Sequence, residues 1–244
     1  MVGPEVGVAV AGGVGMVMLF VVGVAAMIGL LVWGYLSNKK RQEAITAWVA
    51  ARDWRRLPPD RSLAYRWRGE PFNNSGDNER IDEVVAGAHL GWRLASFAYS
   101  YETHSTNSKG ERDTTTHSFH VIALDLPAAL PDLQVSPESV FSRIATAFGA
   151  HDLDVESDAF NKSYNVRASD LAVGHAILHP RLIERLLREP GRQAWRIEGA
   201  TLLSWTPGRT DVAALDHRIA LLAAIADSVP RHIWLDHGHD PITR

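Results

Sequence analysis

The N-terminal segment of this chain contains no charged residue between Val6 and Asn38. About 20 apolar residues cross a bilayer as a helix, so the segment is long enough to span a membrane. A cleaved signal peptide would need a basic start and a shorter apolar core, whereas residues 1–5 contain no Lys or Arg. A helix buried in a soluble core would rarely stay uncharged over this length. We therefore expect residues 1–37 to form one transmembrane anchor.

Positive charge follows this segment directly, whereas Glu5 precedes it. The basic residues close to the membrane are Lys39, Lys40, Arg41, Arg52, Arg55 and Arg56. Because Lys and Arg are retained on the cytoplasmic side, we expect the N-terminus outside and the C-terminal domain in the cytoplasm. Trp33 and Tyr35 fall where the span would meet the cytoplasmic headgroups, which is typical of interfacial aromatic residues.

The span is rich in small residues. Ala11 and Gly15 are four residues apart, as are Ala25 and Gly29, so each pair lies on one helix face. This spacing permits close contact with a second helix, and a homodimer through the span is therefore one prediction. The alternative is that glycine is simply frequent in transmembrane helices.

Residues 38–60 are predicted to form a basic helix next to the membrane, running to about Arg56. Ile45, Trp48 and Val49 form an apolar stripe at helical spacing, and Pro58-Pro59 ends the pattern. The positive charge is attracted to anionic lipid, so the lipid bilayer is the first expected partner. A plain topology signal on a solvated helix is the alternative. The whole chain carries a net charge of −3, which argues against nucleic acid as a partner.

Residues 61–235 are expected to form one soluble α+β domain, followed by a flexible tail over residues 236–244. The strongest pattern is a hairpin, because residues 91–102 and 114–126 both alternate apolar and polar side chains around a polar loop that contains Gly110. Further strands are expected at 63–67, 133–135, 153–156, 164–167, 195–197 and 202–205, and helices at 136–149, 158–161, 169–178, 180–189 and 211–228. Residues 81–88 fit a helix or a strand, and Pro127 and Pro131 are expected to interrupt the chain. Local hairpins without a βαβ rhythm predict an antiparallel sheet with packed helices.

Several segments together resemble one protein family. They are AYSYETHSTNSKGERDTTTHSFHVIALDLPAALPDLQVSPESVF, FNKSYNVRASD, HPRLIERLL and WRIEGATLLSWTPGR. In this order they resemble a family of uncharacterised, single-pass, membrane-anchored proteins of actinobacteria, over about residues 40–236. The resemblance implies a span, a basic helix and a soluble domain at a bacterial inner membrane. It implies no catalytic residue, because the family has no established activity.

The residues that could carry chemistry form no recognised catalytic signature. The chain has no cysteine, which excludes a thiol nucleophile and cysteine-ligated zinc. It also has no P-loop and no nucleophile elbow. His232, His237 and His239 could hold a metal only in a rigid segment, so we expect neither a metal nor a cofactor. His179 is expected to cap the helix that begins at Pro180.

Two functions from different classes fit these observations. The favoured one is a membrane-tethered interaction module that binds a protein partner or a lipid surface, because of the anchor and the basic stretch. The alternative is a membrane-bound hydrolase with a site assembled from distant residues such as His120, Asp125 and Ser163. That alternative requires these side chains to converge in one concave pocket.

Overall fold

The computed structural model describes residues 6–72, 76–106, 110, 112–138 and 151–242, with side chains from residue 19 onward. The chain forms two compact units, residues 1–48 and 49–244. The first unit contains most of helix α1 (Val6–Ala51). The most apolar window of α1 between Leu19 and Ala51 has a mean hydropathy of 2.3 and is not buried inside the protein. In the described part of the chain this is the one helix long and apolar enough to cross a membrane, which agrees with the expected anchor.

Helix α1 ends earlier than the sequence predicted. It stops at Ala51, and Asp53 then adopts a left-handed backbone with a φ of 56°. The N–H of Trp54 donates back to the carbonyl of Val49 at 3.2 Å, which closes the end of the helix. The expected helical residue Arg56 therefore belongs to a short strand instead.

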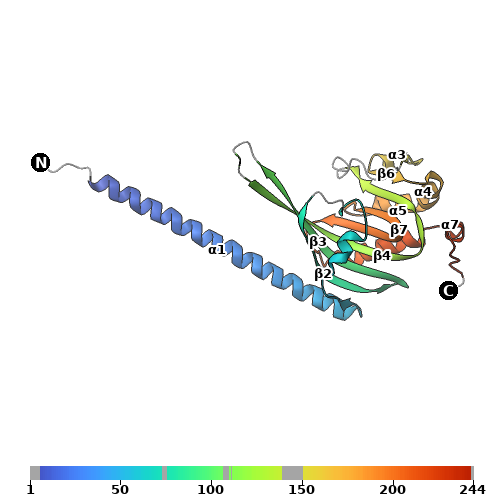
Figure 1. Ribbon diagram of the computed structural model, residues 1–244, viewed down its shortest axis with the longest axis horizontal. Helices are drawn as coiled ribbons and strands as arrows, with labels where there is room; N and C mark the ends of the chain where they lie inside the picture. The colour runs from blue at the N-terminus through green and yellow to red at the C-terminus, as the bar shows by residue number, and fades with distance from the viewer. Residues whose placement is uncertain (1–5, 73–75, 107–109, 111, 139–150, 243–244) are drawn as a thin grey trace. The chain divides into compact units, whose positions relative to one another are not determined.

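An antiparallel sheet of seven strands forms the centre of the second unit (Figure 1). The strands are β1 (Arg55–Arg56), β2 (Asp77–His89), β3 (Trp92–Thr106), β4 (Arg112–Pro137), β5 (His151–Asp152), β6 (Tyr164–Ala168) and β7 (Ala194–Pro207). The order across the sheet is β1-β2-β3-β4-β6-β5, and β7 pairs with the opposite edge of β4. This arrangement confirms the predicted α+β fold with an antiparallel sheet.

The predicted hairpin is confirmed as β3 and β4, which pair from Leu94 and Leu124 out to Thr106 and Arg112. The ambiguous segment 81–88 is part of strand β2. Pairing of β3 with β2 ends at Glu102, and pairing of β4 with β7 ends at Phe119. The outer part of the hairpin therefore projects from the sheet as a two-stranded ribbon (Figure 1).

Strand β4 continues through the prolines that were expected to interrupt it, so this prediction was wrong. Pairing with β3 ends at Leu124 and pairing with β6 begins at Leu133. Pro127 and Pro131 lie between these two limits, where the pairing with β7 also shifts register. A proline has no N–H to donate, and both prolines occupy positions without a register partner on β3, β6 or β7. The predicted break is therefore an irregularity inside one long strand.

Strand β7 likewise joins two segments that the sequence separated. Gly199 adopts a φ of 55° and lies opposite Leu130, where the pairing of β7 with β4 is irregular. Glycine tolerates this left-handed backbone because it has no Cβ. The expected gap between the strands 195–197 and 202–205 is therefore a bulge within one strand.

Two short segments expected as strands have other structures. Residues 61–65 form the 3₁₀ helix η1 (Arg61–Tyr65), because the side chain of Asp60 accepts a hydrogen bond from the N–H of Ser62 and starts a helical turn. Residues 153–156 follow β5 without being part of it. The side-chain amide of Asn161 bonds both the N–H and the carbonyl of Val155, which replaces a strand partner.

Five further helices follow the chain order. They are α3 (Asp158–Asn161), α4 (Leu171–Ile177), α5 (Pro180–Arg188), α6 (Leu215–Asp227) and α7 (Arg231–Asp236). Asp170 caps α4, and the ring of His179 accepts a hydrogen bond from the N–H of Leu182, which confirms its predicted capping role. The predicted helix with its stripe of Val140, Ile144 and Phe148 lies outside the described residues.

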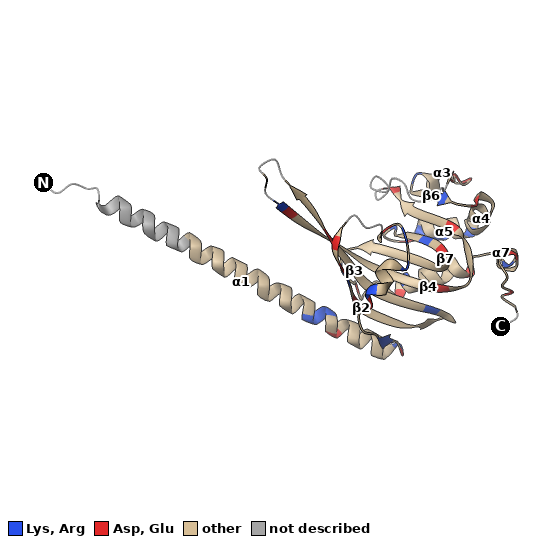
Figure 2. Ribbon diagram, viewed as in Figure 1, with Lys and Arg blue, Asp and Glu red and all other residues tan. Residues whose placement is uncertain are grey.

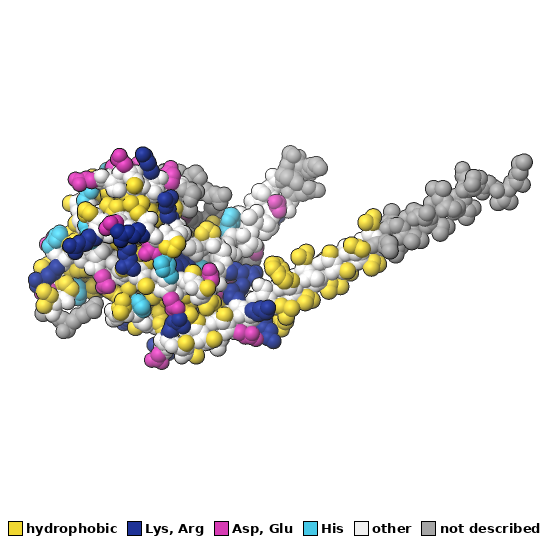
Figure 3. All heavy atoms as spheres, turned by 180° about the vertical axis from the view of Figure 1, so that it is seen from behind, with side chains coloured by type: hydrophobic (Ala, Val, Ile, Leu, Met, Phe, Trp, Pro, Cys, Tyr) yellow, Lys and Arg dark blue, Asp and Glu magenta, His cyan; other side chains and the backbone are white. Residues whose placement is uncertain are grey.

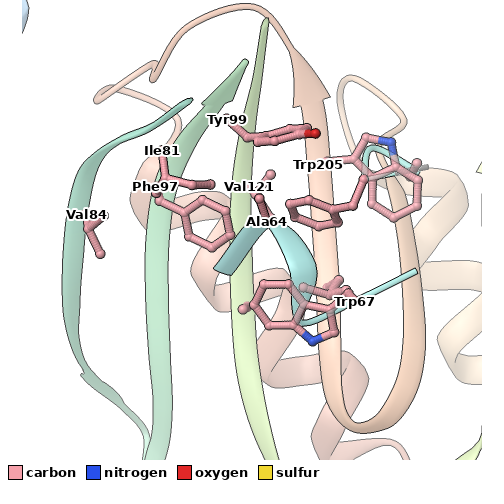
Figure 4. Packing of buried hydrophobic residues seen from close by; sticks show 12 residues of the cluster. Ala64, Trp67, Ile81, Val84, Phe97, Tyr99, Val121 and Trp205 are labelled. Atoms are coloured by element: carbon pink, nitrogen blue, oxygen red, sulfur yellow. The ribbon is translucent and has the colours of Figure 1, made fainter. Parts of the chain in front are cut away.

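One face of the sheet packs against η1 and the segment that follows it. Residues of β2, β3, β4 and β7 converge there with Ala64, Trp67 and Phe72 (Figure 4). The Phe97 ring stacks on Trp67 with centroids 6.1 Å apart, and Tyr99 lies 4.9 Å from Phe72. Aromatic pairs at these separations add stability beyond the apolar area they bury.

The opposite face of the sheet is covered by α6. Ile219, Leu222 and Ile225 are buried on the inner side of this helix. Arg218, also on α6, donates to the carbonyl of His120 on β4 at 3.3 Å, which fixes the helix to this face. Because side chains alternate along a strand, His120 belongs to the α6 face and Val121 to the η1 face.

Trp54 packs against Gly87 of β2, close to where β1 pairs with that strand. Its indole N–H donates to the carbonyl of Ala88 at 3.3 Å, and its side chain is buried. A Cβ placed on Gly87 would lie 2.3 to 2.5 Å from three atoms of the Trp54 ring. Only a residue without a side chain allows this close approach.

Candidate binding site

The membrane-proximal residues named from the sequence lie on two parts of the chain. Trp33 and Tyr35 are 70% and 69% exposed on α1, outside any protein core. In Figure 2 the described part of α1 is free of charge until a band of basic residues begins. That band is Lys39, Lys40 and Arg41. Upstream of it, large hydrophobic side chains are exposed along the helix, as Figure 3 shows.

The basic residues differ in how they are engaged. Lys39 is 3.9 Å from Glu43, an exposed pair that contributes little. Arg52 donates from Nε to Asp216 of α6 at 2.6 Å and is tied to the domain by this fork-like contact. Arg55 and Arg56 are exposed on β1. Arg41, which is half-buried, donates to the side chain of Asn38 at 2.6 Å. Arg52 therefore serves the fold.

A cleft of about 450 Å³ opens between η1 and the first residues of β2. Its lining residues are Arg61, Ala64, Tyr65, Gly76, Asp77, Asn78, Glu79 and Ile81. The volume falls within the range of about 300 to 1,000 Å³ that small-molecule sites occupy. The cleft combines a guanidinium, two carboxylates, an amide and a phenol, so its walls both donate and accept hydrogen bonds.

A β-bulge shapes one wall of this cleft. The pairing of β2 with β3 shifts register between Asp77 and Arg80, and Asn78 adopts a left-handed φ of 60°. Bulges of this kind redirect side chains and are frequent beside functional sites. Gly76 precedes the bulge, and a Cβ there would lie 2.5 Å from the Tyr101 ring. The strand can therefore approach the hairpin closely only with glycine at this position.

Glu79 is the most constrained polar group of the cleft. The hydroxyl of Tyr99 donates to its Oε1 at 3.3 Å, and Tyr65 bonds to the same carboxylate. The other oxygen, Oε2, is buried and accepts no hydrogen bond from any described residue. Burial and then the nearby Glu79 raise the pKa of Tyr99, and the hydrogen bond to Glu79 raises the pKa of Tyr65, so both phenols stay protonated donors.

A second polar group of side chains is enclosed under α6. His120 shares a hydrogen bond of 2.8 Å with Ser96 and contacts Arg218, whose Nε donates to Gln193 at 2.8 Å. All four side chains are buried. Burial, and then the charge of Arg218, hold the pKa of His120 well below 6.5, and burial lowers the pKa of Arg218 to about 10. These contacts join α6 to the sheet.

The residues of the hydrolase alternative are not brought together. His120 lies under α6, whereas Asp125 shares the opposite face of β4 with Val121 and lies 3.9 Å from Arg66. Ser163 follows α3, where its N–H bonds the carbonyl of Phe160. The three side chains thus do not form the pocket that this alternative required.

The C-terminal histidines make local contacts of their own. The ring of His237 hydrogen-bonds the carbonyl of Ile233 at 2.8 Å, and His239 packs edge-on against Trp234. Arg231 pairs with Asp240 at 3.0 Å, which ties part of residues 236–244 back to α7. In the described part of the chain, no three His, Asp or Glu residues are grouped closely enough to hold a metal ion.

The sequence did not identify the cleft. No binding motif marks residues 76–80, and residues 63–67 were expected to form a strand. Gly76 followed by Asn78 was the available signal, because both residue types tolerate unusual backbone geometry. Nothing local indicated that Tyr65 and Glu79 would meet.

Comparison with known proteins places the fold but not the family. No protein-family model and no curated protein matches the chain. Among solved structures, the chain is similar to the crystal structure of the mycobacterial trehalose monomycolate transport factor A, TtfA. The TM-score is 0.58 at 15% sequence identity, and the match covers 76% of this chain and 92% of the other. At this identity the likeness shows a shared fold.

Proposed function

We propose that this protein is a membrane-anchored interaction module, with its domain at the cytoplasmic face of a bacterial inner membrane. The observation that carries the proposal is α1, an exposed apolar helix that could cross a membrane and that continues directly into the basic band of Lys39, Lys40 and Arg41 (Figures 2 and 3). Retention of Lys and Arg on the cytoplasmic side supports this orientation. Dimerisation through the span stays a prediction.

Anionic lipid is the partner that the basic band favours. Each Lys or Arg close to the membrane surface contributes about 1 kcal/mol of attraction to an anionic leaflet. Lys39, Lys40 and Arg41 directly follow the uncharged segment, so they lie at headgroup depth once α1 spans the bilayer. Arg52 is left out of this role because Asp216 already engages it.

The likeness to TtfA suggests the process that the module serves. By its name, that protein is a factor in the transport of trehalose monomycolate. By analogy of fold, we propose that this chain is an accessory factor in the transport of a membrane lipid, acting through contacts with a protein partner and the lipid surface. The fold alone assigns no substrate, so the proposal rests first on the anchor.

The orientation can be tested because the natural chain has no cysteine. Gly3→Cys and Ser105→Cys place single thiols before the span and on the exposed hairpin. We expect a membrane-impermeant maleimide to label the first variant in intact cells and the second only after permeabilisation. The reverse pattern would refute the proposed topology.

Lipid preference needs a separate measurement. In native mass spectrometry of the full chain released from detergent, we expect phosphatidylglycerol to be retained over phosphatidylcholine. Replacing Lys39, Lys40 and Arg41 by Gln should remove most of this preference. The matched control replaces Arg181, Arg185 and Arg188 on α5, which are also exposed. An equal loss in both variants would argue against a specific role for the basic band.

A further inference from the structure

We infer that the cleft between η1 and β2 binds a polyhydroxylated group, such as the sugar headgroup of a glycolipid or a free saccharide. The inference uses the proposed function only to choose between these two sources. Its physical basis is the wall chemistry, the carboxylate of Glu79 and the exposed ring of Tyr65.

The wall chemistry selects hydroxyl groups over simple ions. A hydroxyl both donates and accepts hydrogen bonds, and the cleft offers Glu79 and Asp77 as acceptors and Arg61 as a donor, with the amide of Asn78 able to do both. A phosphate would be repelled by the two carboxylates. An ammonium group could pair with the carboxylates, but it has no acceptor for the guanidinium of Arg61 or the amide N–H groups of Asn78.

Glu79 provides a specific acceptor for a hydroxyl group of the ligand. Its Oε1 is bonded by Tyr99, whereas Oε2 is enclosed without a hydrogen bond from any described residue. Glu79 lines the cleft, and a carboxylate has about four lone-pair sites, so a ligand hydroxyl can donate to it. A hydrogen bond to a carboxylate is of the stronger, charge-assisted kind.

Tyr65 provides an apolar surface at the mouth of the cleft. Its side chain is 73% exposed, although its hydroxyl is bonded to Glu79. The ring is therefore held in place by one end while a face remains open to a ligand. A sugar presents C–H groups on its ring faces, and the apolar residues Ala64 and Ile81 also line the cleft. An aromatic face beside polar groups is the usual composition of a small-molecule site.

The wall of the cleft also has unusual backbone geometry, which an ordinary surface depression does not need. Its wall depends on Gly76, where a side chain would collide with Tyr101 and with the carbonyl of Glu102 at 2.6 Å. The left-handed Asn78 then follows. Unusual backbone of this kind is concentrated at ligand sites, because the surrounding contacts must hold it in place.

The test uses the full chain held in amphipol, with maltose as the free saccharide and octyl maltoside below its micelle concentration as the glycolipid probe. Binding is measured by titration calorimetry and saturation-transfer NMR. We expect both sugars to bind, and Glu79→Gln to weaken binding about tenfold through loss of the charge-assisted bond. Tyr65→Ala should weaken it as well. Because Tyr65 is exposed, this second variant keeps the fold intact.

The matched control is Glu184→Gln, which removes an exposed carboxylate on α5 far along the chain from the cleft. It should leave sugar binding unchanged. Tighter binding of octyl maltoside than of maltose assigns the site to a glycolipid headgroup, and equal affinities assign it to a free saccharide. An octyl polyethylene glycol ether, which has the tail without the sugar, should not compete.

Three outcomes would overturn the inference. They are no detectable sugar binding, binding that survives both Glu79→Gln and Tyr65→Ala, and preferential binding of octylphosphocholine in the same cleft. None of these results bears on the topology or on the lipid preference of α1. Failure of the sugar site is thus distinguishable from failure of the proposed function.

Discussion

Replacing Gly87 by Ala should destabilise the domain through one contact, with Trp54. The new Cβ would lie 2.3 to 2.5 Å from three ring atoms, well inside the 3.0 Å that real Cβ atoms respect. The ring must move by about 1 Å to reach a normal carbon separation of about 3.5 Å. It is 6% exposed, so it has little room to do so.

The magnitude follows from two costs. Overpacking of a filled site costs about 1 to 3 kcal/mol. Displacing the ring also stretches the bond from its indole N–H to Ala88, already 3.3 Å long, which is worth about 0.5 to 1.5 kcal/mol. We therefore expect Gly87→Ala to lower the free energy of unfolding by about 2 to 4 kcal/mol. Urea unfolding of the full chain in detergent, followed by tryptophan fluorescence, measures this.

A double-mutant cycle isolates the proposed cause. Trp54→Ala alone should cost about 3 to 5 kcal/mol. In that background Gly87→Ala should cost less than about 0.5 kcal/mol, because the ring it collides with is gone. The control is Gly199→Ala, where no atom lies within 4 Å and only the left-handed backbone costs about 1 to 2 kcal/mol. An unchanged penalty for Gly87→Ala without Trp54 would refute the reasoning.

Two further predictions concern the buried network and a helix cap. Burial holds the pKa of His120 well below 6.5 in the folded protein. As the pH falls from 7 to 5, His120 therefore becomes protonated in the unfolded chain but stays neutral in the folded protein. Stability should then fall by up to about 1.4 kcal/mol per pH unit below 6.5, and His120→Asn should show a shallower slope in urea midpoints; equal slopes would count against the buried, neutral ring. Asp170→Ala should cost about 1 kcal/mol in the same assay, since the N–H groups of Ala172 and Val173 lose their acceptor, while Asp170→Asn should cost much less. Equal losses in both Asp170 variants would show that the charge, and not the cap, is what matters.

The sequence predicted those elements whose signals are local. The β3–β4 hairpin follows from alternation on both sides of a polar loop, and the cap at His179 follows from the proline that comes after it. The apolar helix α1 follows from the absence of charge alone. In each case the residues that determine the structure are neighbours along the chain.

The errors arose where a distant partner decides the structure. Pro127 looks like the end of a strand, yet β4 continues because β7 supports the other edge and no ladder bond is needed at the proline. Gly199 looks like a turn from its neighbours alone. Its register partner, Leu130, is far away in the sequence, so the sequence does not show that the strand continues. The local signals correctly indicated an irregular backbone at both positions. They wrongly predicted that the strand ends there.

The candidate site shows the same limit. Arg61 and Tyr65 come from η1, whereas Glu79 comes from a bulged strand, and neither segment has a motif of its own. Their meeting depends on how η1 packs over the aromatic core. A ligand site formed by packing leaves no spacing pattern in the sequence, so only the fold could reveal it.

The position of β4 between β3 and β7 also orders the events of synthesis. A ribosome releases β3 and β4 one after the other, so the hairpin can form early, but Val121 must wait for Trp205 to pair on its second side. Until then the nascent chain presents an open edge whose residues, Val121 through Leu124, are nearly all fully buried in the finished protein. Exposed apolar edges recruit other strands. A nascent chain stalled before Ala194 would therefore be the species most in need of a chaperone, and release of β7 ends that requirement.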